Sequence, residues 1–280
     1  EEYVKKNKKN FIKDIPDLKP YKKIGNKIKI AYFSAEFHDH PVLHQMAEIF
    51  KNHDKDKFEI YAFSHGRVEG DAWRNQIKKY FKKFYIINDL SDDKVVGLAR
   101  ELGIDIAINL TGLTKNLRTE IFLKRAAPIQ INYLGYPATL GTSSIDYIIA
   151  DKNVIPEYNK KFFTEKVEYL PNYYSPKPTD IFFRKSEKNY TRKCFNLPEK
   201  EIVFCAITNP IKINPGIFKV WMNILKRVKG SVLWLAAKND KFKENLLYEA
   251  YEKGLDKSRL IFTEIIKKKD STYSPLALYF

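Results

Sequence analysis

A histidine-rich loop follows the first β-rich segment of this sequence and is suited to proton transfer. His40 and His44 are separated by three residues, the first of them Pro41, and an imidazole exchanges protons near neutral pH. This spacing also suits a metal pair, but Pro41 stands where a zinc protease motif needs glutamate. An imidazole at His40 could take a hydroxyl proton, and a helix cap or a structural contact are the alternatives.

A lysine at the start of a predicted helix is a second position where chemistry is expected. Lys212 lies just before a helix that begins at Pro215, with Asn214 as its N-cap. A cation beside the free N–H groups of a helix N-terminus makes an anion-binding site. The alternative is an ordinary surface lysine, because the chain contains 50 lysines and arginines.

The elements that must position these residues alternate between short β-rich and helical segments, which is typical of a parallel sheet wound with helices. The predicted strands of the first region are 27–35, 58–64, 84–88, 105–110, 129–134 and 147–150, and its predicted helices are 41–51, 71–81, 92–102 and 116–125. In such sheets the ligand crevice lies beyond the carboxyl ends of the strands. We therefore expect the loops that follow the strands to carry the site.

A second group of elements begins near residue 201. Its predicted strands are 201–207, 231–236 and 259–265, with two helices between them. The first helix is predicted to bury one apolar face, made of Ile217, Val220, Trp221, Ile224, Leu225 and Val228. Three strands are half of a usual doubly wound domain, so we expect an uncovered apolar surface around Trp221, Trp234 and the tail at 276–280.

Several segments, taken together and in order, resemble the O-GlcNAc transferase family. They are HPxxH at 40–44, GID at 103–105 leading to TGxTK at 111–115, APIQ at 127–130 leading to LGYP at 134–137, DYIIAD at 146–151, TEK at 164–166, WxxILKRV at 221–228 and SVLWL at 231–235. Each segment is weak evidence alone, but the ordered set is specific. The resemblance spans roughly residues 27 to 262.

The resemblance implies an α/β fold of the GT-B type, with two Rossmann-like domains, the second incomplete here. It implies transfer of GlcNAc, or a related hexose, from a UDP-sugar to Ser or Thr of a protein, with inversion of the anomeric centre. Transfer to Asn is a close alternative. No metal or other cofactor is expected, so protein groups must meet the charge of the departing diphosphate.

The resemblance also assigns roles to residues. Lys212 matches the catalytic lysine, and His40 matches a histidine that acts as a base or positions the acceptor. Asp105 stands where some members have histidine and is a third catalytic candidate, with an orienting role or a structural role at the strand edge as alternatives. The substrate-binding candidates are Thr111, Gly112, Gly135, Tyr136, Pro137 and Asn209. A turn that ends a strand is the alternative for residues 135–137, and a cap or turn is the alternative for Asn209.

The domain organisation follows from these segments. We expect a basic linker or the end of an upstream helical region at 1–26, a first Rossmann-like domain at 27–185, and the first half of a nucleotide-sugar domain at 194–280. Both ends look cut, since the initiator Met and the family's later His-Thr-Thr motif do not occur. The full-length form is expected to be an enzyme. For the chain as given, a catalytically inactive remnant or a protein-binding module is the alternative.

Composition limits the remaining possibilities. A hydrophobic fraction of 44% excludes a disordered chain. The formal charge of +16 favours polyanions in general, but the basic runs lie in predicted tails and connectors, so specific nucleic-acid binding is not expected. The two cysteines lack paired spacing, and no apolar run approaches about 18 residues, which favours a cytoplasmic protein without a membrane partner. The expected partners are a UDP-sugar donor and a protein or peptide acceptor.

Overall fold

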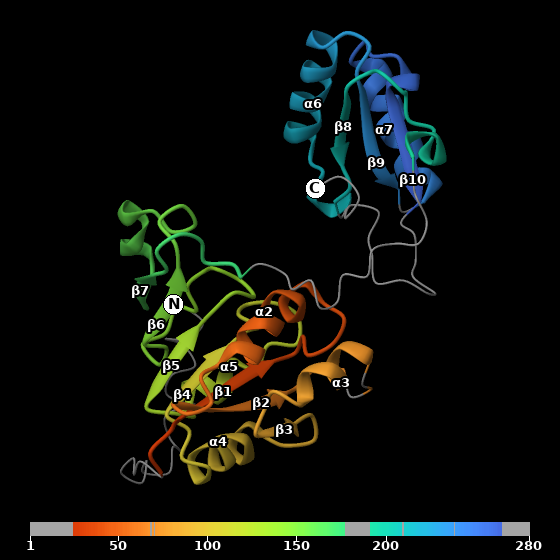
Figure 1. The fold of residues 1–280 in the computed structure, drawn as a ribbon. Helices are drawn as coiled ribbons and strands as arrows, with labels where there is room; N and C mark the ends of the chain where they lie inside the picture. The colour runs from red at the N-terminus through yellow and green to blue at the C-terminus, as the bar shows by residue number, and fades with distance from the viewer. Residues whose placement is uncertain are drawn as a thin grey trace. The chain divides into compact units, whose positions relative to one another are not determined.

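The computed structural model contains two compact units, Glu1–Thr179 and Asp180–Phe280 (Figure 1). It describes residues 25–67, 69, 71–176, 191–208, 210–237 and 239–264. Residues 1–24 of the predicted linker, residues 185–190 of the predicted boundary, the candidate Asn209 and the tail at 276–280 lie outside the described residues. Each unit has its own parallel β-sheet.

The first unit is built on a seven-stranded parallel sheet of order β3-β2-β1-β4-β5-β6-β7. The strands are β1 (Ile28–Ser34), β2 (Phe58–Ser64), β3 (Lys83–Ile86), β4 (Ile106–Asn109), β5 (Ile129–Asn132), β6 (Tyr147–Ala150) and β7 (Lys166–Tyr169). The six strands predicted for this region are confirmed, and β7 is an additional edge strand. Because the strand order reverses at β1, a topological switch point lies between the carboxyl ends of β1 and β4.

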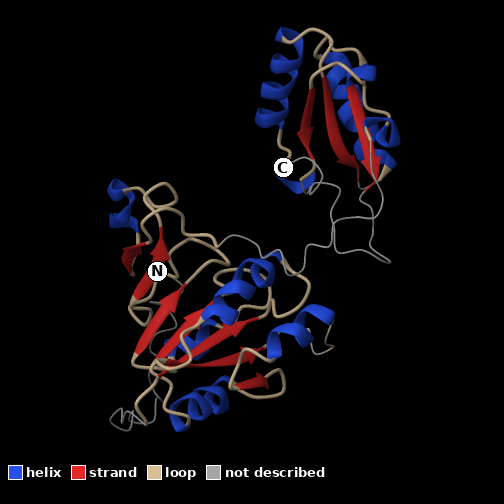
Figure 2. Ribbon diagram, in the orientation of Figure 1, coloured by secondary structure: helices blue, strands red, loops and turns tan. Residues whose placement is uncertain are grey.

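Helices cover both faces of this sheet (Figure 2). They are α2 (Pro41–Asn52), α3 (Ala72–Lys78), α4 (Asp92–Glu101) and α5 (Thr119–Leu123), with a short 3-10 helix η1 at Glu157–Phe162. The side chains of Asp71 and Ser91 cap α3 and α4 at their first turns. The predicted helix 116–125 has only five helical residues, because Asn116 and Arg125 adopt positive φ angles of 65° and 61°.

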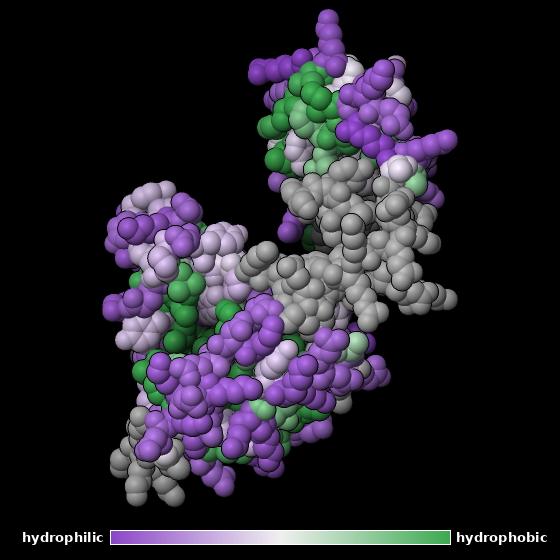
Figure 3. Space-filling view, viewed as in Figure 1, coloured by the Kyte–Doolittle hydropathy of each residue, from purple (hydrophilic) through white to green (hydrophobic). Residues whose placement is uncertain are grey.

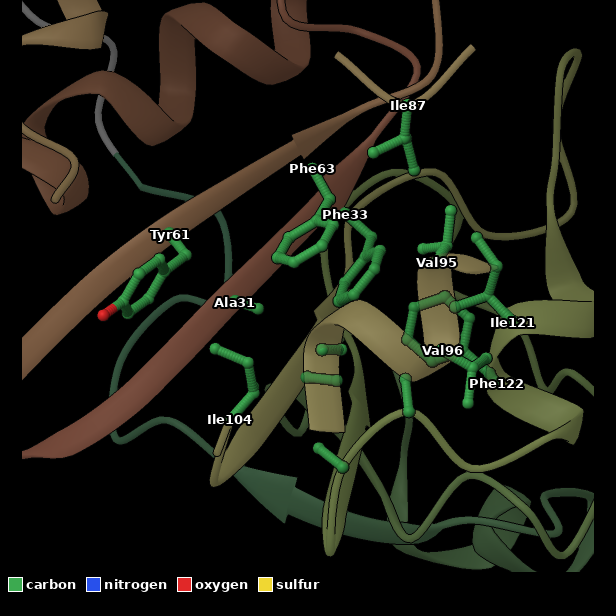
Figure 4. Packing of buried hydrophobic residues seen from close by; sticks show 14 of the residues in the cluster. Ala31, Phe33, Tyr61, Phe63, Ile87, Val95, Val96, Ile104, Ile121 and Phe122 are labelled. Atoms are coloured by element: carbon green, nitrogen blue, oxygen red, sulfur yellow. The ribbon is translucent and has the colours of Figure 1, made fainter. Parts of the chain in front are cut away.

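Aromatic side chains make the core on either side of β1. Phe33 stacks on Phe63 of β2 with ring centroids 4.5 Å apart and meets Phe122 of α5 edge-on at 5.3 Å (Figure 4). On the other face Tyr32 contacts Phe50 of α2 at 4.9 Å. Each such pair contributes about 0.5–1.5 kcal/mol beyond its buried area. The carboxyl end of β1 is therefore held firmly between two layers of helices.

A buried arginine fixes the loop that follows β1. Arg74 of α3 is fully buried, and its Nε donates a hydrogen bond of 2.7 Å to the carbonyl oxygen of Phe37. Its guanidinium also bonds the carbonyl oxygen of Arg67. Phe37 itself packs edge-on against Phe84 at 5.2 Å. The histidine-rich loop thus starts from an anchored position.

The second unit contains a three-stranded parallel sheet of order β10-β9-β8. Its elements are β8 (Val203–Ala206), β9 (Val232–Ala237), β10 (Leu260–Glu264), α6 (Pro215–Arg227), α7 (Asp240–Glu252) and the 3-10 helices η3 (Arg192–Phe195), η4 (Pro210–Lys212) and η5 (Lys257–Arg259). The three predicted strands are confirmed. No helix in the described parts of either unit has both the length and the apolarity needed to cross a bilayer.

The apolar faces of the second unit differ from the prediction in two ways. Trp234 is 1% exposed rather than uncovered, because Phe195 and Leu197 pack over it. The face that α6 buries is made of Phe218, Met222 and Leu225, whereas three residues of the predicted face are exposed: Ile217, Val220 and Ile224. The helix carries apolar residues over more than one face, so periodicity alone did not select the buried one. Figure 3 shows hydrophobic residues on the surface over α6.

Candidate active site

A pocket lies at the switch point of the first unit, where the loops after β1, β4 and β5 meet. Its volume is about 390 Å³, and it is lined by Ala35, Glu36, His38, His40, Val42, Thr111, Thr114, Lys115, Asn116 and Gly135. The structure therefore brings three sequence candidates together: His40, Thr111 and Gly135. Sequence reasoning missed Glu36 and His38, although they belong to the same loop as His40.

Close backbone contacts lock the loops of this pocket together. A Cβ atom on Gly135 would lie 1.9 Å from the carbonyl oxygen of Leu110, so only glycine fits there. Gly112 has a φ of +64°, and a Cβ atom on it would lie 3.0 Å from the Cβ of Tyr136. Leu134 holds a φ of 71°, which is unusual for a bulky residue. This local strain marks a backbone shape that the surrounding packing imposes.

A buried carboxylate joins the first two loops. Thr111 Oγ1 donates a hydrogen bond of 2.9 Å to Glu36 Oε2 and accepts one of 3.0 Å from the backbone N–H of Ala35. Ser34 Oγ donates to the same carboxylate oxygen at 3.0 Å. Burial raises the pKa of Glu36, while the hydroxyl donors Thr111 and Ser34 oppose that shift. The Thr111 side chain is thus occupied in holding the pocket wall.

His40 is the N-cap of α2, and this contact decides its tautomer. Its Nδ1 accepts a hydrogen bond of 3.3 Å from the backbone N–H of Val42. A neutral imidazole that accepts at Nδ1 carries its proton on Nε2. Burial, followed by the nearby His44, lowers the pKa of His40, so the ring is neutral at pH 7. His40 can therefore donate a hydrogen bond from Nε2.

The neighbouring histidines have different environments. His44 Nε2 lies 2.8 Å from Asp39 Oδ1, and its ring stacks on Trp73 at 3.9 Å. The His38 ring lies 5.6 Å from the His40 ring, and its Nδ1 is buried without a hydrogen-bond partner. Burial and then the His40 ring lower the pKa of His38.

The structure does not bring Asp105 to the pocket. Asp105 precedes β4, whereas the pocket lies beyond the carboxyl end of that strand. Its Oδ2 accepts a hydrogen bond of 2.6 Å from the backbone N–H of Lys29, at the start of β1. The expectation that Asp105 lies in or near the crevice is therefore wrong. The residue precedes β4 and lies at the amino ends of the strands, a full strand length from the pocket. Asp105 performs the structural role that the sequence left open.

The remaining candidates are placed as follows. Tyr136 is 47% exposed beside Gly112, and Pro137 follows it in the same turn, where Tyr136 O accepts the N–H of Ala138. Lys212 ends η4 in the second unit and is exposed. The side chain of Asn214 accepts the N–H of Ile217 at 3.0 Å, which confirms the predicted N-cap of α6.

The buried histidine that follows β2 makes the stability of the first unit depend on pH. His65 follows β2, is 8% exposed, and neither of its ring nitrogens has a partner with hydrogen-bond geometry. Burial, followed by Arg118, lowers its pKa from 6.5 to about 4. Between these values the unfolded chain binds a proton that the folded chain does not, so stability falls as pH falls.

We expect His65 to remove about 2 kcal/mol from the free energy of unfolding when pH drops from 7 to 5. His65→Leu should abolish this part of the pH dependence while keeping the fold, since leucine fills a similar volume. Urea denaturation of both proteins at pH 5 and 7 measures it. Equal losses in the two proteins would contradict the buried, neutral histidine.

Comparison with known proteins gives relatives of one enzyme class. The profile of glycosyl transferase family 41 matches residues 7–188 and 185–273. The probable UDP-N-acetylglucosamine–peptide N-acetylglucosaminyltransferase SEC of Arabidopsis thaliana is 32% identical over 262 residues, which are 90% of this chain and 26% of that protein. The UDP-N-acetylglucosamine–peptide N-acetylglucosaminyltransferase of Caenorhabditis elegans is 25% identical, over 88% of this chain and 31% of that protein. The chain thus spans less than a third of the length of these relatives.

Solved structures show the same fold. A mutant of the O-GlcNAc transferase of Thermobaculum terrenum matches with a TM-score of 0.76 and 23% identity, over 91% of this chain and 47% of that one. A glycosyltransferase of Rickettsia africae matches with a TM-score of 0.53 and 10% identity, over 88% of this chain and 70% of that one. The α/β fold of the GT-B type is confirmed. The family profile covers well over half of the sequence, and the chain therefore belongs to glycosyl transferase family 41.

Proposed function

We propose that the whole protein transfers GlcNAc from UDP-GlcNAc to Ser or Thr hydroxyl groups of proteins, with inversion and without a metal ion, in the cytoplasm. Family membership supports glycosyl transfer, and the names of the relatives support the donor and the peptide acceptor. The observation that carries the proposal is the pocket at the switch point, where His40 presents an Nε2–H donor between glycine-tight loops.

Each residue then has a separate task. The acceptor hydroxyl attacks the anomeric carbon from the face opposite the leaving UDP, which gives inversion. His40 positions the acceptor by donating from Nε2, and the loops around Gly112 and Gly135 shape the wall. Lys212, beside the N-terminus of α6, meets the negative charge that develops on the diphosphate. A fixed cation of this kind takes the place that a metal ion has in other transferases.

The linkage and the mechanism can be read from the product. Label transferred from UDP-[³H]GlcNAc should be released from the acceptor by mild alkaline β-elimination, and transfer should persist in EDTA. NMR coupling of the anomeric proton should report inversion. Label that resists alkali but is released by an amidase specific for Asn-linked sugar would replace the Ser/Thr acceptor with asparagine.

The role of His40 can be separated from its role as a helix cap. His40→Asn keeps an N-cap side chain but places no Nε2–H in the pocket, whereas His40→Ala removes both. We expect kcat to fall about 10²-fold in both variants. Only His40→Ala should lose about 1 kcal/mol of stability. Steady-state kinetics and thermal unfolding measure the two effects. Normal turnover in His40→Asn would show that His40 serves the helix alone.

A further inference from the structure

Two polar atoms in the pocket are left unused. Glu36 accepts its side-chain hydrogen bonds at Oε2, and no hydrogen bond reaches Oε1 within the described part of the chain. His38 Nδ1 is buried and has no partner. Both side chains line the same pocket, two residues apart on the loop after β1. A buried unpaired donor or acceptor carries a free-energy cost, so the His38 nitrogen needs an explanation.

His40 is not suited to be the base that accepts the acceptor's proton. Its Nδ1 lone pair is occupied by the N–H of Val42, and its Nε2 already holds the ring proton. To bind another proton it would have to break the cap of α2. His38 makes no such contact, and its ring lies next to the His40 ring, at 5.6 Å between centroids.

We propose that Glu36 and His38 form a carboxylate–imidazole pair in which His38 is the general base of the transfer and Glu36 is its positioning residue. The pairing requires a rotation of the His38 side chain that places Nδ1–H on Glu36 Oε1, and this contact would fix the tautomer with a free lone pair on Nε2. The inference rests on the function proposed above. It adds a residue, His38, that the sequence motifs do not assign.

The step balances as follows. The acceptor oxygen forms a bond to the anomeric carbon while the bond from that carbon to the UDP oxygen breaks. The electron pair of the broken bond leaves with UDP, and the hydroxyl proton passes to Nε2 of His38. The resulting imidazolium is stabilised by the Glu36 carboxylate and later releases its proton to water. His40, which stays neutral, holds the acceptor oxygen by its Nε2–H.

The charges around His38 fit this task. On its own loop it faces Glu36, which raises its pKa, and His40, which lowers it. From the segment before α3 it faces Asp71, which raises the pKa, and Arg67, which lowers it. Burial is the largest influence and keeps the ring neutral and ready to accept a proton at pH 7.

Long-range ¹⁵N–¹H NMR on the 280-residue chain tests the pair without any activity assay. We expect His40 to carry its proton on Nε2 and His38 on Nδ1. Glu36→Gln should lower the pKa of His38 by at least about half a unit and shift its proton toward Nε2. The signals of His53 should not change, and neither should any histidine in the control variant Glu48→Gln, a half-buried position on α2 outside the pocket. A His38 proton on Nε2 in the unchanged chain would overturn the pairing, and so would a His38 pKa that does not respond to Glu36→Gln. The first of these observations needs no variant, so the test stands even if Glu36→Gln folds poorly.

Kinetics of the whole protein test the base. His38→Gln should lower kcat about 10²-fold with little change in KM for the UDP-sugar. Glu36→Gln should lower kcat and move the acidic limb of the pH–rate profile to lower pH, because His38 loses the charge that favours its protonation. Wild-type transfer with an unchanged His38→Gln rate would refute the base while leaving the proposed function intact. A wild-type protein without any transfer would instead refute the proposed function, and the NMR result would still decide the pairing.

Discussion

Replacing Lys212 with methionine is expected to lower kcat for sugar transfer by about 10² to 10³-fold, while KM for the UDP-sugar changes little. The lysine ends η4 just before the capped N-terminus of α6, where free N–H groups and an ammonium both favour an anion. Charge on the diphosphate grows in the transition state, so a fixed cation stabilises that state more than bound substrate. Removing one such group typically costs about 2.7 to 4 kcal/mol. Steady-state kinetics with saturating acceptor separate kcat from KM.

The matched control for this prediction is Lys219→Met. Lys219 is also exposed and lies one turn into α6, so its replacement removes the same charge from the same unit. Its rate should stay within about twofold of wild type. If Lys212→Met raised only KM, the lysine would bind ground-state substrate and the leaving-group role would be wrong. Equal losses in both variants would reduce the effect to general surface charge.

Replacing Gly135 with alanine should destabilise the first unit by about 3 kcal/mol or more. The new Cβ would lie 1.9 Å from Leu110 O and 2.9 Å from Thr111 O, and both are backbone atoms that cannot rotate away. The loops after β4 and β5 would have to separate, and the pocket wall would move with them. Chemical denaturation measures the free energy, and hydrogen exchange at Leu110 and Tyr133 shows whether the loss begins at these loops.

Gly97→Ala is the internal comparison for Gly135→Ala. Gly97 lies in α4, and an added Cβ there meets no atom within 4 Å. Because alanine is the better helix former, this variant should be stabilised by about 0.5–1 kcal/mol. A Gly135→Ala protein as stable as wild type would mean that the loops have room the structure does not show. The pocket would then be less rigid than the account of the site requires.

The positions of the strands were predictable because the first unit obeys strong local rules. Buried parallel strands appear as short runs such as 58–64, and turn and capping residues such as Ser91 and Gly103 separate them from helices. The edge strand β7 was missed, because its alternation of exposed and buried side chains extends over only four residues, of which Val167 alone is buried. The exposed side of α6 was misjudged for the opposite reason, since apolar residues surround much of the helix.

Candidate residues were located well where the rule about strand ends applies, and poorly where it does not. His40, Thr111 and Gly135 follow strands and meet in one pocket. Asp105 was predicted to belong to the site because it is part of a family motif. It precedes its strand, however, and therefore lies at the amino ends of the strands rather than at the carboxyl ends. The tautomer of His40 and the unused atoms of Glu36 and His38 depend on hydrogen bonds that only the folded structure contains.

Transfer of radiolabelled GlcNAc from UDP-GlcNAc to a protein acceptor by the whole protein is the most direct test of the account. We predict incorporation that UDP inhibits, that alkaline β-elimination releases, and that falls at least about 10²-fold in Lys212→Met. Calorimetric titration with UDP on the same preparation shows whether the donor side is folded. UDP binding without any transfer to a panel of protein acceptors, or transfer that Lys212→Met leaves unchanged, would contradict it.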